Sequence, residues 1–325
     1  MKREFFLNKM LCIVLIILAN VACNTESPTS TIEYTLSEKD LIPEGITFDP
    51  VTRQIFVSSI GKEKIVAVSE DGRESDFVTP GQDSIMQTLG MKVDAERRRL
   101  WVVSNETVGK TSFSAIHVYD IDSKLLLKRV IVKDTVNQLF NDIALDSRGD
   151  SYITDSYGSQ IYNYSFESGR LELYAGPDSL LRFVNGIVVS PDDKLIYAAA
   201  GAQITIIDAV SKSVYPVGDP GKTGSGGIDG IVFYKGSLIG VTNSKDTESE
   251  MFVARYNLSS DMKVIEEVII LDKGNPLFNL PTTCTLANDE LFYLGNTSLR
   301  LYFQDKTDSK GLFMNPLILK YSLSE

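Results

Sequence analysis

The chain has 325 residues, of which 43% are hydrophobic and 23% are charged, and this balance predicts a globular protein with a large core. The length allows either one large β domain or two smaller domains. The formal net charge of −11 at pH 7 argues against a nucleic-acid partner, because phosphate binding needs Lys and Arg side chains clustered on one surface.

The first residues have the pattern of an export signal, in which basic residues precede a short apolar run and small residues follow it. The apolar run at 10–19 is too short to span a bilayer. Val21-Ala22-Cys23 resembles the end of a bacterial lipobox, whose cysteine is lipidated and becomes the mature N-terminus. We expect a signal peptide at 1–22, a lipidated tether at 23–31, and attachment to a membrane of the bacterial cell envelope, in the periplasm or at the outer membrane. A cleaved signal without lipidation is the alternative.

Six later segments begin alike, and each opens a short apolar strand. They recur at intervals of about 44 to 53 residues, which is the range expected for propeller blades. This regular repeat favours one domain over residues 32–325. The openings read Pro43-Glu44-Gly45-Ile46, Thr88-Leu89-Gly90-Met91, Phe140-Asn141-Asp142-Ile143, Val184-Asn185-Gly186-Ile187, Ile228-Asp229-Gly230-Ile231 and Pro281-Thr282-Thr283-Cys284.

The fourth repeat serves as the template, with β-rich runs at 186–189, 194–200, 203–208 and 213–217 separated by turn residues. Four antiparallel strands in each of six repeats predict an all-β, six-bladed β-propeller. No helical periodicity is visible outside the export signal. The last repeat is one strand short, so we expect the alternating residues Ile32, Tyr34 and Leu36 to complete it and close the ring.

The innermost strands of a propeller line its central channel, so the opening residues meet around the axis at one mouth. Four openings carry a carboxylate or amide at the equivalent position, namely Glu44, Asn141, Asn185 and Asp229, whereas Leu89 and Thr282 occupy the other two. These hard oxygen donors predict a divalent-cation site, with Ca²⁺ first, Mg²⁺ or Mn²⁺ next and Zn²⁺ less favoured. Alternatively, these side chains only cap their own turns.

The pairs Glu44-Gly45, Asn141-Asp142, Asn185-Gly186 and Asp229-Gly230, with Ser190-Pro191-Asp192 after the third, resemble the blade openings of the regucalcin/gluconolactonase superfamily, also called the senescence-marker-protein family. The resemblance covers about residues 40–325. It implies a divalent cation bound by Glu44, Asn185 and Asp229, with Asn141 as a further ligand or substrate contact. It also implies hydrolysis of a small lactone or ester, with Asp229 as base or nucleophile. Leu139 stands where sugar lactonases carry an Arg, which removes an anchor for a sugar.

The segments after the second strands should overhang the same mouth and determine specificity. Asp155, Tyr157 and Asn243 are the candidate substrate contacts there, and each could instead be a turn-forming polar residue. The longest of these segments, at 106–114 and 244–251, are predicted to be loops that form a lid. Phe140 and Phe183, each near a candidate ligand Asn, are expected to pack between blades.

The single histidine, His117, argues against a Ser-His-Asp hydrolase. Cys284 lacks a histidine partner and is predicted to be a small buried residue. Two functions stay open: a metal-dependent hydrolase of a small molecule, or a non-catalytic propeller whose cation is structural and whose face binds a protein or glycan. The clustering of the oxygen ligands at the axis favours the hydrolase. The oligomeric state is left open by the sequence.

Overall fold

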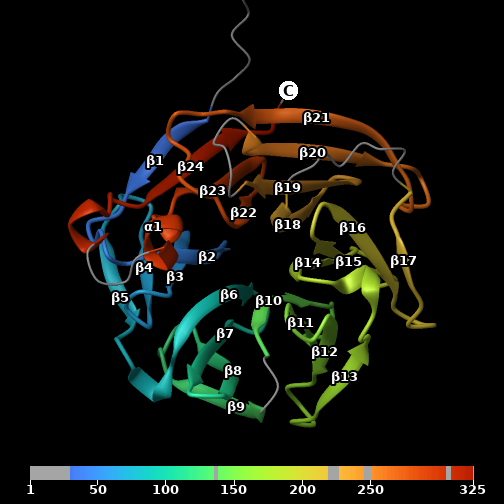
Figure 1. Cartoon of the computed structure of the whole chain (residues 1–325), viewed down its shortest axis with the longest axis horizontal. Helices are drawn as coiled ribbons and strands as arrows, with labels where there is room; N and C mark the ends of the chain where they lie inside the picture. The colour runs from blue at the N-terminus through green and yellow to red at the C-terminus, as the bar shows by residue number, and fades with distance from the viewer. Residues whose placement is uncertain (1–29, 135–137, 219–226, 245–249, 305–308, 325) are drawn as a thin grey trace, which may run out of the picture.

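The computed structural model describes residues 30–134, 138–218, 227–244, 250–304 and 309–324. The predicted signal peptide and Cys23 lie outside these ranges. The described chain forms six four-stranded antiparallel sheets, arranged as blades around a central axis (Figure 1). The predicted six-bladed propeller is therefore confirmed.

Blades 1 to 3 follow one another in sequence, and each begins with its innermost strand. Blade 1 contains β2 (Pro43–Asp49), β3 (Gln54–Ser59), β4 (Lys64–Val68) and β5 (Glu74–Val78). Blade 2 contains β6 (Gln87–Asp94), β7 (Arg99–Val108), β8 (Thr111–Asp120) and β9 (Leu126–Asp134). Blade 3 contains β10 (Phe140–Leu145), β11 (Ser151–Asp155), β12 (Gln160–Tyr164) and β13 (Leu171–Ala175).

Blades 4 and 5 repeat this order, and the predicted strands of blade 4 agree with the observed ones to within a few residues. Blade 4 contains β14 (Val184–Val189), β15 (Leu195–Ala200), β16 (Gln203–Asp208) and β17 (Val214–Pro216). Blade 5 contains β18 (Gly227–Tyr234), β19 (Ser237–Asn243), β20 (Phe252–Leu258) and β21 (Ile265–Lys273).

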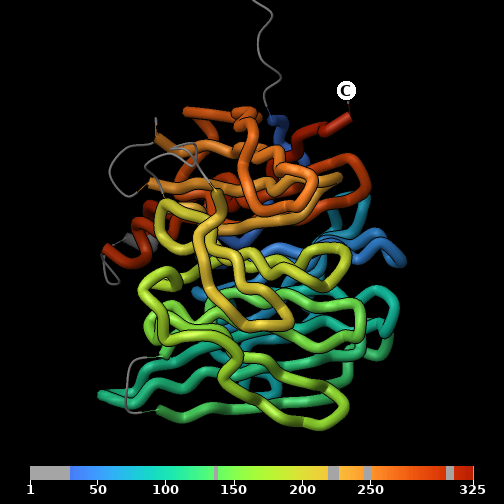
Figure 2. Tube along the Cα trace, turned by 90° about the vertical axis from the view of Figure 1, so that its right-hand side faces the viewer, coloured from blue at the N-terminus to red at the C-terminus, as the bar shows by residue number. Residues whose placement is uncertain are grey.

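Blade 6 joins the two ends of the domain, as the sequence predicts. It contains β22 (Cys284–Ala287), β23 (Glu290–Asn296), β24 (Leu317–Ser322) and, outermost, β1 (Thr31–Thr35). The first strand pairs antiparallel with the last, from Thr31 opposite Lys320 to Thr35 opposite Leu317. The blue and red ends of the chain therefore meet in Figure 2. This closure protects sheet edges that would otherwise be open to pairing.

Two sequence-based expectations about connections were wrong. Residues 106–114 are not a loop, because β7 and β8 continue as a paired hairpin whose turn is Gly109-Lys110. No helical periodicity is visible in the sequence after the export signal, yet the structure has α1 (Leu299–Gln304) and short 3-10 turns at Gln82–Ser84, Ser179–Leu181 and Ser309–Leu312. These elements are too short to produce a readable periodicity. No helix in the described ranges is long and apolar enough to cross a membrane.

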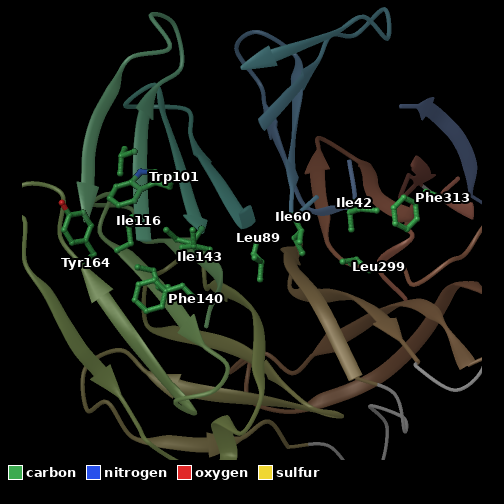
Figure 3. Packing of buried hydrophobic residues seen from close by; sticks show 13 residues of the cluster. Ile42, Ile60, Leu89, Trp101, Ile116, Phe140, Ile143, Tyr164, Leu299 and Phe313 are labelled. Carbon is green, nitrogen blue, oxygen red and sulfur yellow. The ribbon is translucent and has the colours of Figure 1, made fainter. Parts of the chain in front are cut away.

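The cores lie between neighbouring blades and are filled by aromatic and branched side chains. In the cluster of Figure 3, the rings of Trp101 and Tyr164 meet edge to face with centroids 5.9 Å apart. Phe140 is fully buried in the same cluster, which confirms its predicted packing role. The matching prediction for Phe183 was wrong, because 58% of this residue is exposed. Cys284 is buried without a disulfide, as expected.

Candidate functional site

The inner strands of blades 1 to 5 each contain a β-bulge at the repeated opening. The pairing register shifts between Pro43 and Ile46 in blade 1 and between Ile228 and Ile231 in blade 5, and blades 2 to 4 have the same irregularity. A bulge adds a residue to one strand and re-aims the side chains there. The four candidate ligands all lie inside such bulges.

The glycines that follow three of the candidate ligands are required by close contact with the next blade. A Cβ atom on Gly45 would lie 2.2 Å from the carbonyl oxygen of Leu89, and one on Gly186 would lie 2.3 Å from that of Asp229. A Cβ atom on Gly230 would lie 2.6 Å from a backbone atom of blade 6. Glycine therefore lets the bulges of neighbouring blades touch, and this brings the ligand positions together at the axis.

Each of the four candidate ligands presents one buried oxygen that receives no hydrogen bond within the described part of the chain. Glu44, Asn141 and Asp229 are only 6%, 8% and 7% exposed. Buried polar atoms in folded proteins are almost always paired, so four unpaired oxygens from four blades require an explanation. An interpretation in which these side chains only cap their own turns leaves these atoms unexplained. The atoms are Glu44 Oε2, Asn141 Oδ1, Asn185 Oδ1 and Asp229 Oδ1.

The other polar atoms of two ligands are held by neighbouring groups. Asn141 donates from Nδ2 to Ser156 Oγ at 3.0 Å, and that hydroxyl donates to the Val184 carbonyl at 2.6 Å. Asn243 donates from Nδ2 to Asp229 Oδ2 at 2.6 Å and to the Pro281 carbonyl at 3.3 Å. These bonds fix the orientation of the side chains and leave Asn141 Oδ1 and Asp229 Oδ1 without a donor.

The electrostatics of the two carboxylates favour a bound cation. Burial raises the pKa of Glu44 well above its ordinary value, and the charges of Asp229 and Asp142 raise it further. Burial also raises the pKa of Asp229 to about 7, and the charge of Asp142 raises it further. The nearby Asn185 amide and the hydrogen bond from Asn243 act in the opposite direction. Buried, neighbouring carboxylates are costly to ionise alone. A divalent cation would compensate both charges, so the residues fit such an ion.

The donor chemistry fits a hard cation. In the described ranges no group of three or more His, Cys, Asp or Glu side chains could hold a metal. A site here must therefore combine the carboxylates with the amide oxygens of Asn141 and Asn185. An all-oxygen set of this kind is typical of Ca²⁺, whereas zinc sites more often use nitrogen and sulfur.

The three candidate substrate contacts have different surroundings. Asp155 is 1% exposed, and it accepts hydrogen bonds from the Leu139 and Gly158 amides, both at 3.0 Å, and from Gln160 Nε2 at 2.9 Å. Both of its carboxylate oxygens are thus engaged, which favours the turn-forming interpretation. Tyr157 is 56% exposed and follows the Ser156 that supports Asn141. Asn243 contacts Asp229 directly.

Several supporting residues were missed by the sequence reasoning. Thr282 and Thr283 both donate from Oγ1 to the Glu44 carbonyl, at 2.9 Å and 2.6 Å, and so tie blade 6 to blade 1 beside the site. Asp142 takes the place of the opening glycine and accepts from the Ile143 and Ile187 amides at 2.8 Å and 3.2 Å. The repeat alignment gave a signal for Asp142 as the departure from glycine. It gave none for the threonine contacts.

The channel continues beyond the site along the inner strands. A cavity of about 330 Å³ is lined there by later residues of those strands, including Phe48, Lys92 and Phe233. These residues lie three or four positions after the opening residues Glu44, Leu89 and Asp229. The cavity therefore occupies the opposite half of the channel from the candidate cation site.

No family model matches the chain. Among curated proteins, the uncharacterized protein YncE of Escherichia coli K12 is 27% identical over 149 residues, which are 45% of this chain and 40% of that protein. YncE of Salmonella typhi is 23% identical over 178 residues, which are 54% of this chain and 48% of that protein. The matches thus span less than half of these relatives.

Three solved structures share the architecture. A PQQ-bound aldose sugar dehydrogenase from Streptomyces coelicolor has a TM-score of 0.62 at 13% identity, covering 90% of this chain and 98% of its own. A gluconolactonase from Xanthomonas campestris has a TM-score of 0.58 at 16% identity, covering 90% and 87%. A luciferin-regenerating enzyme has a TM-score of 0.59 at 13% identity, covering 90% and 92%. At these identities the likeness establishes the fold alone.

Proposed function

We propose that this protein is a divalent-metal-dependent hydrolase of a small lactone or ester. The observation that carries the proposal is the set of four buried, unpaired oxygens, one from each of four blades. The solved gluconolactonase supports the proposal only as a protein with this architecture. A non-catalytic propeller would need the cation for stability alone, and it would not need an Asp held in one orientation by a neighbouring amide.

Glu44, Asn141, Asn185 and Asp229 would hold the cation, with Ca²⁺ preferred over Mg²⁺, Mn²⁺ and Zn²⁺. When bound, the cation would polarise the substrate carbonyl and stabilise negative charge on its oxygen. Asp229 is the candidate catalytic group. Asp229 Oδ2 accepts a hydrogen bond from Asn243. The unpaired Oδ1 would therefore face the axis, where Asp229 would act as base or nucleophile.

The rim of the mouth suggests how a substrate is received. Tyr157 and Phe183 are 56% and 58% exposed, and they flank the hydrogen bond from Ser156 to the Val184 carbonyl between blades 3 and 4. We assign Tyr157 and Asn243 as substrate contacts, and Asp155 as a residue that shapes the turn carrying Tyr157. Exposed aromatic rings beside the site favour a substrate with an apolar portion over a polyhydroxylated sugar.

We also propose that the protein is exported and held at a membrane of the bacterial cell envelope by a lipid on Cys23. The support is the order of basic residues, apolar run and Val21-Ala22-Cys23 in the sequence. A tether would leave the propeller free to reach small molecules outside the cytoplasm.

The hydrolase proposal is tested with the purified protein and a panel of lactones and aryl esters. Metal is removed with a chelator, and turnover is measured before and after Ca²⁺, Mg²⁺, Mn²⁺ or Zn²⁺ is restored. We expect turnover that depends on the cation. The Asp229→Asn variant should fold but should have no turnover. A panel with no substrate under any metal would favour the non-catalytic propeller, and full turnover by Asp229→Asn would refute the role of Asp229.

A further inference from the structure

The short helix α1 lies at the mouth because its first residue is anchored on the blade 1 side. Leu299 is 4% exposed and belongs to the buried cluster that contains Ile42, Ile60 and Phe313 (Figure 3). The same cluster contains Leu89, which occupies one of the two axis positions without a candidate ligand. The helix is therefore fixed by apolar packing close to the axis.

The next residue, Arg300, reaches towards blade 5. Its Nη2 atom donates to the carbonyl oxygen of Ser244 at 2.9 Å. Ser244 directly follows Asn243, which holds Asp229 Oδ2. The Arg300 guanidinium therefore contacts the residue next to Asn243, whose side chain orients the candidate catalytic carboxylate.

One buried donor of Arg300 has no partner among the described residues. Its Nε atom is buried and has no partner, and no ion pair joins Arg300 to any described residue. Glu250 lies on the same side of the mouth, but it accepts a hydrogen bond from Ser244 Oγ at 3.0 Å and makes no ion pair with Arg300. A guanidinium carries five N–H donors in a planar fork. Arg300 therefore has a buried Nε donor that no described residue pairs with, in a chain with a net charge of −11.

The chemistry of the Arg300 guanidinium points to an anionic ligand. Guanidinium groups bind carboxylates through two parallel hydrogen bonds, which fix both position and orientation. The remaining donors of Arg300 match this chemistry.

We propose that Arg300 binds a carboxylate group of the substrate, so that the site selects lactones or esters that carry a negative charge. This inference rests on the proposed hydrolase function and names the class of its substrate. The reacting carbonyl would lie at the cation and Asp229, and the carboxylate would lie at the guanidinium. Arg300 is thus a specificity-determining residue supplied by the only α-helix in the described ranges.

A matched pair of lactones tests the inference, namely 5-oxotetrahydrofuran-2-carboxylate and its carboxamide, which differ in charge but little in size. We expect the metal-loaded wild-type protein to hydrolyse the carboxylate with a kcat/KM at least about tenfold higher, mainly through a lower KM. Arg300→Gln should remove this preference, so that the carboxylate and the carboxamide are hydrolysed with similar kcat/KM. Arg300→Lys, which keeps the charge without the fork, should retain part of it.

Arg53→Gln is the matched control, because Arg53 is an exposed arginine that pairs with Glu70 on an outer turn of blade 1. Arg53→Gln changes the net charge by the same amount as Arg300→Gln, and it should not alter the rate of hydrolysis of either lactone. Equal kcat/KM for the two lactones in wild type, or an equal loss of both in Arg300→Gln, would overturn the inference while leaving the hydrolase intact.

The absence of hydrolysis of either lactone would count against the proposed function, and binding then decides the role of Arg300 separately. Calorimetric titration of the metal-loaded protein with the carboxylate lactone should show binding that is lost in Arg300→Gln and kept in Arg53→Gln. Binding that survives in Arg300→Gln, or no binding at all, would overturn the assignment.

Discussion

Asn243 Nδ2 donates a hydrogen bond to Asp229 Oδ2 at 2.6 Å, and this bond leaves Asp229 Oδ1 buried without a partner. The last residue of β19 thereby sets the direction of a carboxylate that belongs to β18 of the same blade. The Asn243 amide reaches blade 6 as well, through the Pro281 carbonyl at 3.3 Å. One side chain therefore orients the candidate catalytic group and ties it to the neighbouring blade.

Replacing Asn243 with Ala should reduce kcat/KM by about 10- to 100-fold, because a hydrogen bond to a charged group typically contributes about 1.5–3 kcal/mol. Steady-state kinetics with the best substrate of the panel would measure the loss. The thermal midpoint of the metal-loaded variant should fall by only a few degrees. Unchanged kinetics would show that Asp229 does not depend on this bond for its orientation.

The bulge glycines predict a steric effect on the site. Gly186→Ala would place a Cβ atom 2.3 Å from the Asp229 carbonyl, so the bulge must shift. We expect a lower thermal midpoint and cation affinity weakened by at least about tenfold. Gly227→Ala is the control, because a Cβ atom there would lie 4.0 Å from its nearest described neighbour, the Gly201 carbonyl oxygen, and this variant should bind the cation normally. Similar affinities for the two variants would contradict the role assigned to the bulges.

The metal-free protein should lose stability as the pH rises. The pKa of Asp229 is raised to about 7 in the folded chain, whereas an unfolded Asp has a pKa of about 3.9. Between these values the folded state binds more protons, so the free energy of unfolding falls with rising pH, by roughly 2–4 kcal/mol in total. The raised pKa of Glu44 acts in the same direction.

Urea unfolding of the chelated protein between pH 4 and pH 8 measures this loss. Asp229→Asn should show a smaller loss across the same window, because the variant lacks the titrating group. Saturating Ca²⁺ should also reduce the loss in the wild type, since the bound cation keeps Asp229 ionised in the folded state. Identical pH profiles for the wild type and Asp229→Asn would refute this prediction.

The proposed lipidation of Cys23 predicts where the protein is found in the cell. Cys23→Ser should move it from the membrane fraction to the soluble fraction of an expressing bacterium and abolish incorporation of labelled palmitate. Fractionation and metabolic labelling measure the two effects. A wild-type protein that is soluble and unlabelled would instead support the cleaved signal without lipidation.

The convergence of Glu44, Asn141, Asn185 and Asp229 was predictable because it follows from a repeat. Equivalent positions of a propeller meet at its axis, and their spacing is visible in the sequence. The closing role of β1 was predictable for a related reason, since the last repeat lacks a strand and Ile32, Tyr34 and Leu36 alternate in the pattern of a strand.

Features outside the repeat could not be predicted in this way. Arg300 belongs to a six-residue helix that has no counterpart in the other blades. The exposure of Phe183 depends on tertiary contacts, which the repeat pattern does not show. Phe183, Ile42 and Leu280 precede their opening positions by the same distance and share a left-handed backbone with φ near 52°, 50° and 55°. Only the Phe183 side chain is exposed, because the neighbouring residues that cover this position differ from blade to blade.

Calorimetric titration of the chelator-treated protein with Ca²⁺ is the most direct test of the central claim, a single cation site built from four blades. We predict one ion per chain for the wild type, and binding at least about 100-fold weaker in both Glu44→Gln and Asp229→Asn. Asp192→Asn, which removes an exposed carboxylate in a turn of blade 4, should bind like the wild type. No binding of Ca²⁺, Mg²⁺, Mn²⁺ or Zn²⁺ by the wild type, or undiminished binding by both site variants, would contradict the account.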